Sequence, residues 1–333
     1  MSASAQMTAV VQHSFGAPEV LTLGQAVRPV PLPTEVLVRV HAAGVNPVDW
    51  QTRAGSGVAW ALGEPPFTLG WDVSGVVEEV GFGVTTLAPG DEVYGMPWFP
   101  RAAGGYAEFV TAPSRQFARK PRSITHEQAA AVPLAALTAW QSLIDTAHVQ
   151  PGQRVLVTAA AGGVGHFAVQ IARHLGAHVI GTASSARHDW LAGLGAGQLI
   201  DYTTVAFEDV LAGANAGAGA GAGVDVVLDL AGDARENTST RSLTVLRPGG
   251  LLIAVPGGVS PELAAAADAA GVRATPFLVE PDGAALARIA ELIDAGTIRV
   301  EVEEVFPLAE VARAHTRGQA GRTRGKLVLL VAS

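Results

Sequence analysis

Two kinds of hydrophobic pattern divide the chain. From Met7 to about Pro121, apolar positions fall in short runs, several of them alternating with polar positions, and Gly and Pro residues separate the runs. This pattern predicts a compact, barrel-like β domain. The expected strands are Thr8 to Val11, Glu35 to Val40, Gly75 to Val80, Glu92 to Tyr94 and Ala107 to Val110.

From Arg154 onward, strand-length apolar runs alternate with segments of helical period. This alternation predicts parallel strands joined by crossover helices, which is a doubly wound sheet in an α/β protein. The expected strands are Arg154 to Thr158, His178 to Thr182, Gln198 to Asp201, Val224 to Leu230, Leu251 to Val255 and Val272 to Val279.

Three connecting segments complete the predicted organisation. Thr125 and Gln128 form a capping box before an Ala-rich helix that Pro133 interrupts. The Gly-rich stretch Ala212 to Gly223 lacks fingerprint spacing and is predicted to be a flexible loop. After Glu280 the alternation stops, so we expect the tail to complete the first domain. The predicted domains are 1–127 with 280–333, and 128–279.

The segment Arg154 to Gly176 contains a strand, a glycine turn and a helix, in that order. The turn carries Ala160-x-Gly162-x-x-Gly165, whose small residues let a pyrophosphate approach the backbone. The helix amino end then offers free N–H groups to the phosphates. The context favours a dinucleotide cofactor over a merely close-packed turn.

The residues after the second strand indicate which dinucleotide. No Asp or Glu follows Ala177 to Ala183, where an acidic residue would bind the ribose of NAD; the chain continues with Ser184, Ser185 and Arg187. Hydroxyls and a guanidinium suit a 2′-phosphate, which predicts NADPH as the cofactor. The alternative is that Arg187 lies on a solvated helix face.

Composition narrows the classes of partner. The 333 residues include 22 Lys and Arg against 30 Asp and Glu, and this net charge of −8 argues against nucleic acid or anionic membranes. The absence of cysteine excludes disulfides, thiolate nucleophiles and cysteine-ligated zinc. The first residues show no secretory pattern, so we expect a cytoplasmic protein.

Motifs along nearly the whole chain resemble the medium-chain dehydrogenase/reductase superfamily, and most of all its zinc-independent quinone oxidoreductase branch. They include AAGVNPVDWQTRAG, GWDVSGVVEEVG, GDEVYGM, GGYAEFV, PLAALTAW, AAAGGVGHFAVQIA, LIDY, LRPGG and GRTRGKLVL. The resemblance implies a GroES-like β domain followed by a Rossmann domain.

The same resemblance implies that no metal is bound. Asn46 stands at the place of one cysteine ligand of the zinc enzymes, Trp71 at the place of the histidine ligand, and Leu134 at the place of another cysteine. Asp72 alone cannot build a zinc site, and the histidines are scattered.

Without zinc, the substrate must be polarised by hydrogen bonds while the cofactor supplies hydride. The resemblance implies that Asn46 donates to the substrate oxygen near the nicotinamide, and that Asp49 orients its neighbours or relays a proton. Trp50 and Trp71 are the expected apolar walls. The alternatives are a turn at Asn46, a local cap at Asp49 and core positions for the tryptophans. No tyrosine stands beside Asn46 in the sequence, which leaves water as a possible proton donor.

The cofactor contacts implied by the resemblance come from several segments, and Lys326 has a surface role as its alternative. They are Asn46, Thr138, Gly162, Gly163, Val164, Ser184, Arg187, Tyr202, Ala231, Pro256, Gly257 and Lys326.

The predicted function is hydride transfer from NADPH to a quinone or an α,β-unsaturated carbonyl, a small-molecule substrate. The alternatives are an enoyl reductase of a biosynthetic pathway and a non-catalytic, crystallin-like NADPH-binding protein. The apolar strand Val272 to Val279 is expected at the sheet edge, where pairing with a second copy would make a homodimer.

Overall fold

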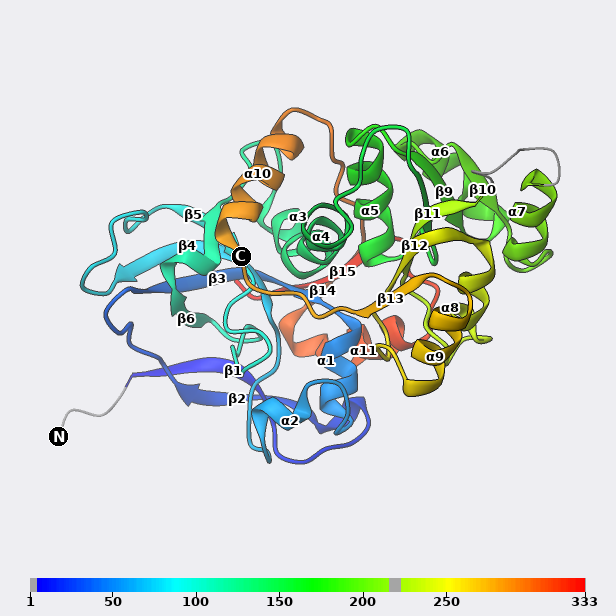
Figure 1. The fold of residues 1–333 in the computed structure, drawn as a ribbon. Helices are drawn as coiled ribbons and strands as arrows, with labels where there is room; N and C mark the ends of the chain where they lie inside the picture. Colours follow the sequence, from blue (N-terminus) through cyan, green and yellow to red (C-terminus); the bar gives the residue numbers. More distant parts are fainter. Residues whose placement is uncertain (1–4, 216–222, 333) are drawn as a thin grey trace. The chain divides into compact units, whose positions relative to one another are not determined.

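The computed structural model describes residues 5–215 and 223–332 (Figure 1). The chain forms two compact units: unit 1 comprises Met1–Leu137 with Glu280–Ser333, and unit 2 comprises Thr138–Val279. The predicted limits of the folding domains, near residues 127 and 280, stay a proposal. Residues 216–222 of the predicted glycine-rich loop lie outside the described residues, and helix α7, Phe207–Asn215, extends into the start of that stretch.

Unit 1 is built on a mixed sheet in the order β14-β15-β3-β4-β5-β7, in which β6 also pairs with β3. A separate hairpin is formed by β1 and β2 (Figure 1). The strands are β1, Gln6–Gln12; β2, Leu21–Val27; β3, Glu35–Val45; β4, Asp72–Val80; β5, Glu92–Gly95; β6, Phe109–Pro113; β7, Phe117–Arg119; β14, Val302–Pro307; and β15, Lys326–Leu330. Alternate valines of β3 and β4 form the apolar core of this sheet, as the period-2 pattern predicts.

The carboxyl-terminal tail completes this sheet, as predicted. Strand β15 pairs antiparallel with β3, so that Leu327 lies opposite Val45. The helices of unit 1 are α1, Pro47–Arg53; α2, Ala59–Leu62; α3, His126–Ala130; α10, Gly283–Asp294; and α11, Val311–Gln319. The predicted capping box at Thr125 and Gln128 starts α3. Helix α4, Pro133–Trp140, begins at the proline that interrupts the Ala-rich segment.

Local chemistry explains why the chain turns into a helix directly after β3. Asn46 is the N-cap of α1, Pro47 occupies the first helical position, and Asp49 completes a capping box. Gly44 precedes this turn, where a Cβ would lie 2.3 Å from the Ala130 carbonyl oxygen. A glycine is therefore required for β3 to approach α3 so closely.

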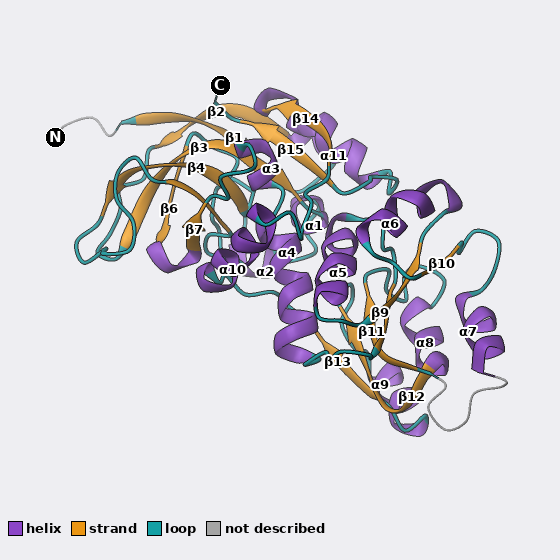
Figure 2. Cartoon of the chain, turned by 90° about the horizontal axis from the view of Figure 1, so that it is seen from above, coloured by secondary structure: helices purple, strands orange, loops and turns teal. Residues whose placement is uncertain are grey.

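Unit 2 is a parallel sheet in the order β10-β9-β8-β11-β12-β13, which is the doubly wound topology predicted (Figure 2). Its strands are β8, Arg154–Val157; β9, His178–Thr182; β10, Gln198–Ile200; β11, Val224–Asp229; β12, Leu246–Ala254; and β13, Arg273–Pro276. The strand order reverses between β8 and β11. The edge strand β13 is shorter than predicted, because pairing with β12 ends at Pro276.

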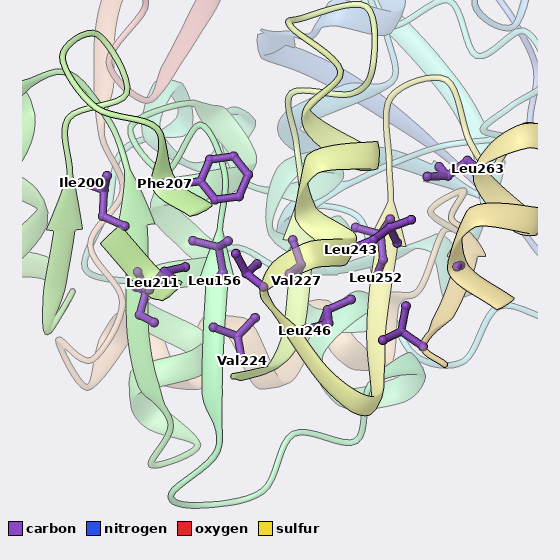
Figure 3. Packing of buried hydrophobic residues seen from close by; sticks show 14 residues of the cluster. Leu156, Ile200, Phe207, Leu211, Val224, Val227, Leu243, Leu246, Leu252 and Leu263 are labelled. Carbon is purple, nitrogen blue, oxygen red and sulfur yellow. The ribbon is translucent and has the colours of Figure 1, made fainter. Parts of the chain in front are cut away.

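The helices that connect these strands are α5, Gly163–His174; α6, His188–Leu194; α7; α8, Thr238–Ser242; and α9, Pro261–Ala269. Side chains of α7 and α9 share one buried cluster with β8, β11 and β12. Figure 3 shows this cluster, in which Phe207 and Leu211 of α7 lie near Leu156 and Val224 of the sheet. Its apolar side chains fix the strands of unit 2 whose carboxyl ends carry predicted cofactor residues. Within residues 5–215 and 223–332, no helix has both the length and the apolar character that a membrane span requires.

Candidate functional site

In unit 2, the turn after β8 leads directly into the amino end of α5. Gly162 is the N-cap of α5, with no side chain bonded to the helix start, and the first N–H groups of a helix have no acceptor within it. A Cβ on Gly165 would lie 2.5 Å from the Ala159 carbonyl oxygen, so only glycine fits there. The Gly162 N–H donates to the Ala159 carbonyl at 3.0 Å, whereas Gly163 and Val164 begin the helix, where N–H groups have no acceptor within it. A helix start of this kind is the geometry that a pyrophosphate requires.

Asp229, the last residue of β11, connects the ends of β8 and β11, the two strands between which the strand order reverses. The Thr158 hydroxyl donates to Asp229 Oδ1 at 2.7 Å, and the Ala231 N–H donates to the same oxygen at 2.9 Å. Ser239 donates its hydroxyl to Oδ2. These bonds hold the loops after β8 and β11 where doubly wound sheets bind their ligands.

The next loop, after β12, carries two more predicted cofactor residues. Pro256 and Gly257 follow the strand, and a Cβ on Gly232 would lie 2.9 Å from the Pro256 carbonyl oxygen. The loops after β11 and β12 are thus in close backbone contact, and Ala231 belongs to the first of them. Thr138, by contrast, lies within α4 and is buried.

The predicted 2′-phosphate residues lie on the turn after β9 and at the end of β10. Ser184 and Arg187 are half-buried, and Tyr202 is 55% exposed. Asp201, which the sequence analysis did not single out, joins the two segments: it accepts from the Ser185 N–H at 2.9 Å and the Thr203 hydroxyl at 2.6 Å. Asp201 directly follows the apolar strand β10, and this position in the sequence could have identified it as a residue of the site.

The Asp201 carboxylate bears on the choice of cofactor. Hydrogen bonds, first from Thr203 and then from Ser185, hold the pKa of Asp201 well below its usual range. The carboxylate is therefore ionised, and it is engaged by donors of its own turn and of the turn after β9. Ribose recognition by an acid at the end of β9 has no counterpart in this sequence, where Ser184 follows Ala183.

In unit 1, Lys326 is buried beside the start of α1. Its ammonium donates to the Val45 carbonyl at 3.1 Å, to Asp72 Oδ2 at 3.3 Å and to Asn46 Oδ1. Asn46 Nδ2 in turn donates to Asp72 Oδ2 at 2.8 Å, and the Leu134 N–H donates to Asp72 Oδ1 at 2.7 Å. The alternative of a surface role for Lys326 is therefore wrong, because its side chain is 3% exposed. We call these residues the lysine cluster.

The lysine cluster brings together positions that the resemblance assigns to metal ligation. Asn46 and Leu134 stand at two cysteine places, and Asp72 follows the histidine place at Trp71. In this cluster the cation that contacts Asn46 and Asp72 is the Lys326 ammonium. Among the residues that the structure describes, no group of three or more His, Asp or Glu is arranged to hold a metal ion.

Asp49 contacts the backbone of Asn46, whose side chain belongs to the lysine cluster, and Asp49 is completely buried. Its Oδ2 accepts the Asn46 backbone N–H at 2.6 Å, so the local-cap alternative is confirmed as a structural role. Burial raises the pKa of Asp49 to about 7, against the lowering effects of this backbone bond and of a hydrogen bond from Tyr106. A tyrosine is therefore close to this loop, although none is adjacent to Asn46 in the sequence.

Tyr106 belongs to a buried chain that the sequence analysis missed. Its hydroxyl lies 3.4 Å from His315 Nε2, and His315 Nδ1 lies 3.2 Å from Arg53 Nη1. Burial, and next the nearby Arg53, lower the pKa of His315 to about 3. We call Asp49, Tyr106, His315 and Arg53 the Asp49 chain. Residues so distant along the sequence carry no common pattern that would have linked them.

The two predicted wall residues differ in their surroundings. Trp71 has no exposed surface, its indole N–H donates to the Arg101 carbonyl at 2.7 Å, and its ring meets Phe99 edge-on. Its environment is that of a core residue, which was the alternative. Trp50 is half-buried and packs against α11, where a Cβ on Gly318 would lie 2.5 Å from its ring. The wall role of Trp50 stays a prediction.

Comparison with known proteins supports the same family along the chain. Residues 32–122 match the alcohol dehydrogenase GroES-like domain, and residues 194–329 match the zinc-binding dehydrogenase family. A mouse mitochondrial NAD(P)H oxidoreductase, RTN4IP1, is 35% identical over 98% of this chain and 90% of its own length. An Arabidopsis thaliana chloroplastic NADPH-dependent alkenal/one oxidoreductase is 32% identical, over 97% of this chain and 79% of its own. The solved quinone oxidoreductase of Coxiella burnetii is 36% identical with a TM-score of 0.90, over 98% of this chain and 100% of its own.

These relatives contradict the expected cytoplasmic location. The mouse protein and its zebrafish, human and bovine counterparts are all named mitochondrial. The expectation depended only on the lack of a secretory pattern in the first residues, and such a lack does not distinguish one non-secretory compartment from another.

Proposed function

Because the chain belongs to the zinc-independent, quinone oxidoreductase-like branch of the medium-chain dehydrogenase/reductase superfamily, we propose that it is an NADPH-dependent reductase of quinones or α,β-unsaturated carbonyls. The observation that carries the proposal is the lysine cluster, which places an ammonium among residues at metal-ligand positions. Related proteins named for alkenal/one and quinone substrates support the substrate class.

The chemistry of such substrates fits an enzyme that uses hydrogen bonds in place of a metal. Bound NADPH supplies the hydride, and the negative charge that forms on the substrate is delocalised over an enolate or a hydroquinone anion. A delocalised charge needs less stabilisation than the localised alkoxide formed from an ordinary ketone. The residues of unit 1 therefore have to orient the substrate oxygen and offer it a donor.

Asn46 has the donor that this role needs. A side-chain amide carries two N–H hydrogens, and Asp72 accepts one of those of Asn46. Lys326 donates to the amide oxygen, and this polarises the amide and strengthens its remaining N–H as a donor. In this role, Asn46 donates to the substrate oxygen, and Lys326 with Asp72 fixes the direction of its amide.

NADPH would be held by the residues at the carboxyl ends of the strands of unit 2. Gly162, Gly163 and Val164 offer backbone to the pyrophosphate, and Ala231, Pro256 and Gly257 line the same sheet edge. Ser184, Arg187 and Tyr202 offer hydroxyls and a guanidinium to the 2′-phosphate. Thr138 and Lys326 stay predictions as cofactor contacts.

The assembly proposed for the enzyme is a homodimer. Strand β13 ends the sheet of unit 2, and its exposed edge is the surface on which pairing would occur. Sedimentation at micromolar concentration tests this: a dimer mass is expected, and a monomer mass would refute it.

The proposed cofactor and substrate class are tested together by the kinetics of one variant. Arg187→Ala should raise the KM for NADPH by roughly ten- to a hundredfold and barely change that for NADH, because a charge-assisted bond to phosphate is worth about 1.5–3 kcal/mol. The matched control is Arg247→Ala. Arg247 pairs with Asp225 near the start of β11, away from the carboxyl ends of the strands where the cofactor is proposed to bind. A wild-type protein that prefers NADH, or that oxidises NADPH with no quinone or enone, contradicts the proposal.

A further inference from the structure

The turn between β8 and α5 is held from both neighbouring strands of unit 2. On the β11 side, the Thr158 hydroxyl donates to Asp229 Oδ1 at 2.7 Å. On the β9 side, Thr182 makes two bonds to the residues that follow Thr158. Its hydroxyl oxygen accepts the Ala159 N–H at 3.1 Å, and its carbonyl accepts the Ala160 N–H at 3.0 Å. Thr182 is the last residue of β9 and is buried.

Ala159 has a backbone conformation that its side chain disfavours. Its φ is +48°, in the left-handed region, where the Cβ of alanine comes too close to the following carbonyl group. A residue other than glycine keeps this conformation only where its surroundings impose it. Here the Thr182 hydroxyl holds the N–H of Ala159, and the Ala159 carbonyl accepts the Gly162 N–H at 3.0 Å. The conformation is therefore held by bonds on both sides of the residue.

This conformation determines where helix α5 begins. The Ala159 carbonyl oxygen also packs on the first turn of α5, since a Cβ on Gly165 would lie 2.5 Å from it. A shift of the Ala159 peptide therefore displaces the N-cap, Gly162, and with it the N–H groups of Gly163 and Val164 at the start of the helix. Those N–H groups have no acceptor within the helix and are the ones that suit a pyrophosphate.

Strand β9 is shaped to receive this turn. A Cβ on Gly181 would lie 3.0 Å from the Ala160 Cβ, so the glycine lets the turn approach the strand closely. A valine in place of Thr182 would have nearly the same shape as threonine, but it would offer the Ala159 N–H no acceptor. The hydroxyl is therefore a feature of this position that packing alone does not require.

We propose that Thr182 is a positioning residue for the cofactor. Its hydroxyl keeps Ala159 in the left-handed conformation, and this directs the N–H groups of Gly163 and Val164 at the pyrophosphate. The inference rests on the proposed function, because it requires a dinucleotide bound at the start of α5. NADPH and NADH share the pyrophosphate, so the contribution of Thr182 is independent of the 2′-phosphate.

The first test measures binding without turnover. Thr182→Val removes the hydroxyl and keeps the β-branched shape. In calorimetric titrations the Kd values for NADPH and NADH should both rise by roughly tenfold, because misdirected N–H groups make weaker charge-assisted bonds. Binding of 2′-AMP, which carries a 2′-phosphate and no pyrophosphate, should not change. Thr182→Ser keeps the hydroxyl and should restore most of the affinity. Unchanged Kd values for both dinucleotides, or an equal loss for 2′-AMP, would overturn the inference.

The second test asks whether Thr182 acts through Ala159. Glycine adopts the left-handed conformation without the cost that alanine has. In a protein that carries Ala159→Gly, Thr182→Val should therefore raise the Kd for NADPH by less than about threefold. A loss of the same size with alanine and with glycine at position 159 would show that the hydroxyl does not act on the conformation of this residue, and the inference would be wrong.

Ser242→Ala is the matched control for Thr182→Val. Ser242 is also a buried hydroxyl residue of unit 2, but it donates to the Thr238 carbonyl at 2.7 Å, within α8. This variant should lower the urea midpoint and leave the affinities for both dinucleotides in place. If it weakens their binding as much as Thr182→Val does, lost stability explains the effect and the turn does not.

These measurements separate the inference from the proposed function. Arg187→Ala should weaken the binding of NADPH alone, whereas Thr182→Val should weaken both dinucleotides. A wild type that prefers NADH contradicts the proposed cofactor, and the effect of Thr182→Val is then still measured with NADH. If Thr182→Val changes neither Kd while the wild type reduces quinones or enones with NADPH, the inference fails and the proposed function stands. A wild type that binds neither dinucleotide contradicts both.

Discussion

The two units bury polar groups in different ways. In unit 2, one carboxylate, Asp229, is satisfied by hydroxyl groups and backbone N–H groups. In unit 1, the lysine cluster pairs buried opposite charges, and the Asp49 chain adds a carboxyl group and an imidazole whose pKa values are strongly shifted. Hydroxyl and backbone donors do not titrate themselves, whereas the carboxyl group and imidazole of the Asp49 chain, whose pKa values are shifted, respond to protons. We therefore expect the Asp49 chain to make the stability of unit 1 depend on pH, and the Asp229 bonds to contribute about equally across neutral pH.

The largest expected effect comes from removing the cation of the lysine cluster. Lys326→Met leaves the Asp72 carboxylate buried without a counter-charge, and breaking a buried pair in this way costs about 3–5 kcal/mol. Urea unfolding should show a loss of this size. Adding Asp72→Asn should restore much of it, because the second change removes the uncompensated charge.

Arg119→Met provides the surface control for this prediction. Arg119 pairs with Asp91 at 2.9 Å, but its side chain is 66% exposed, so the loss should be below about 1 kcal/mol. If Lys326→Met costs no more than Arg119→Met, the buried pair is not what distinguishes unit 1.

The next effect is a pair of opposite pH dependences. The pKa of Asp49 rises from 3.8 to about 7 on folding, so the folded state binds the extra proton and stability falls as pH rises from about 4 to 7. The pKa of His315 falls from 6.5 to about 3, so the unfolded state binds the extra proton and stability rises as pH rises from about 3 to 6.5. Between pH 4 and 6.5 the two contributions cancel.

Single variants should reveal each slope. From pH 4.5 to 6.5, Asp49→Asn should become more stable by about 1.4 kcal/mol per pH unit relative to the wild type, and His315→Gln should become less stable by the same amount. Urea midpoints measured across this range decide the matter. Slopes of the same sign in both variants would mean that these two groups do not carry the pH dependence of unit 1.

A smaller effect is expected in unit 2. Ser239→Ala removes one hydroxyl donor from Asp229, which keeps its bonds from Thr158 and from the backbone. The loss should be about 1 kcal/mol and equal at pH 5 and pH 8, because no titratable group is removed. A cost that changes strongly with pH would show that unit 2 also contains a proton-dependent network.

The same comparison shows what could be read from the sequence. The strands and helices of unit 2, and the glycine turn before α5, are set by local patterns, and all six predicted strands are present. The return of the tail to β3 was also predicted, because the alternation stops after Glu280. The prediction of β13 was too long, since an apolar run says nothing about where its partner strand ends.

The candidate site in unit 1 was only partly predictable. Asn46 and Asp49 lie in a short motif, and their capping box is a local interaction. His315 reaches this group through packing of α11 against α1, which Gly318 permits by leaving room for Trp50. Tyr106 comes from the segment between β5 and β6, where Gly70 leaves room for its ring. Contacts that depend on such packing leave no periodic signal in the sequence.

The smallest expected effect is that of removing metal ions. In the lysine cluster, the cation that faces Asn46 and Asp72 is the Lys326 ammonium, which a chelator cannot extract. Dialysis against EDTA should therefore leave kcat and the unfolding temperature unchanged. One equivalent of added zinc should not remain bound after desalting, as measured by mass spectrometry of the metal.

Asn46→Asp is the companion variant, because it adds a second carboxylate beside Asp72 and should raise metal uptake above that of the wild type. Activity that disappears with the chelator and returns with zinc would show that the ammonium does not replace a metal, and the contrast between the two units would then need a different explanation.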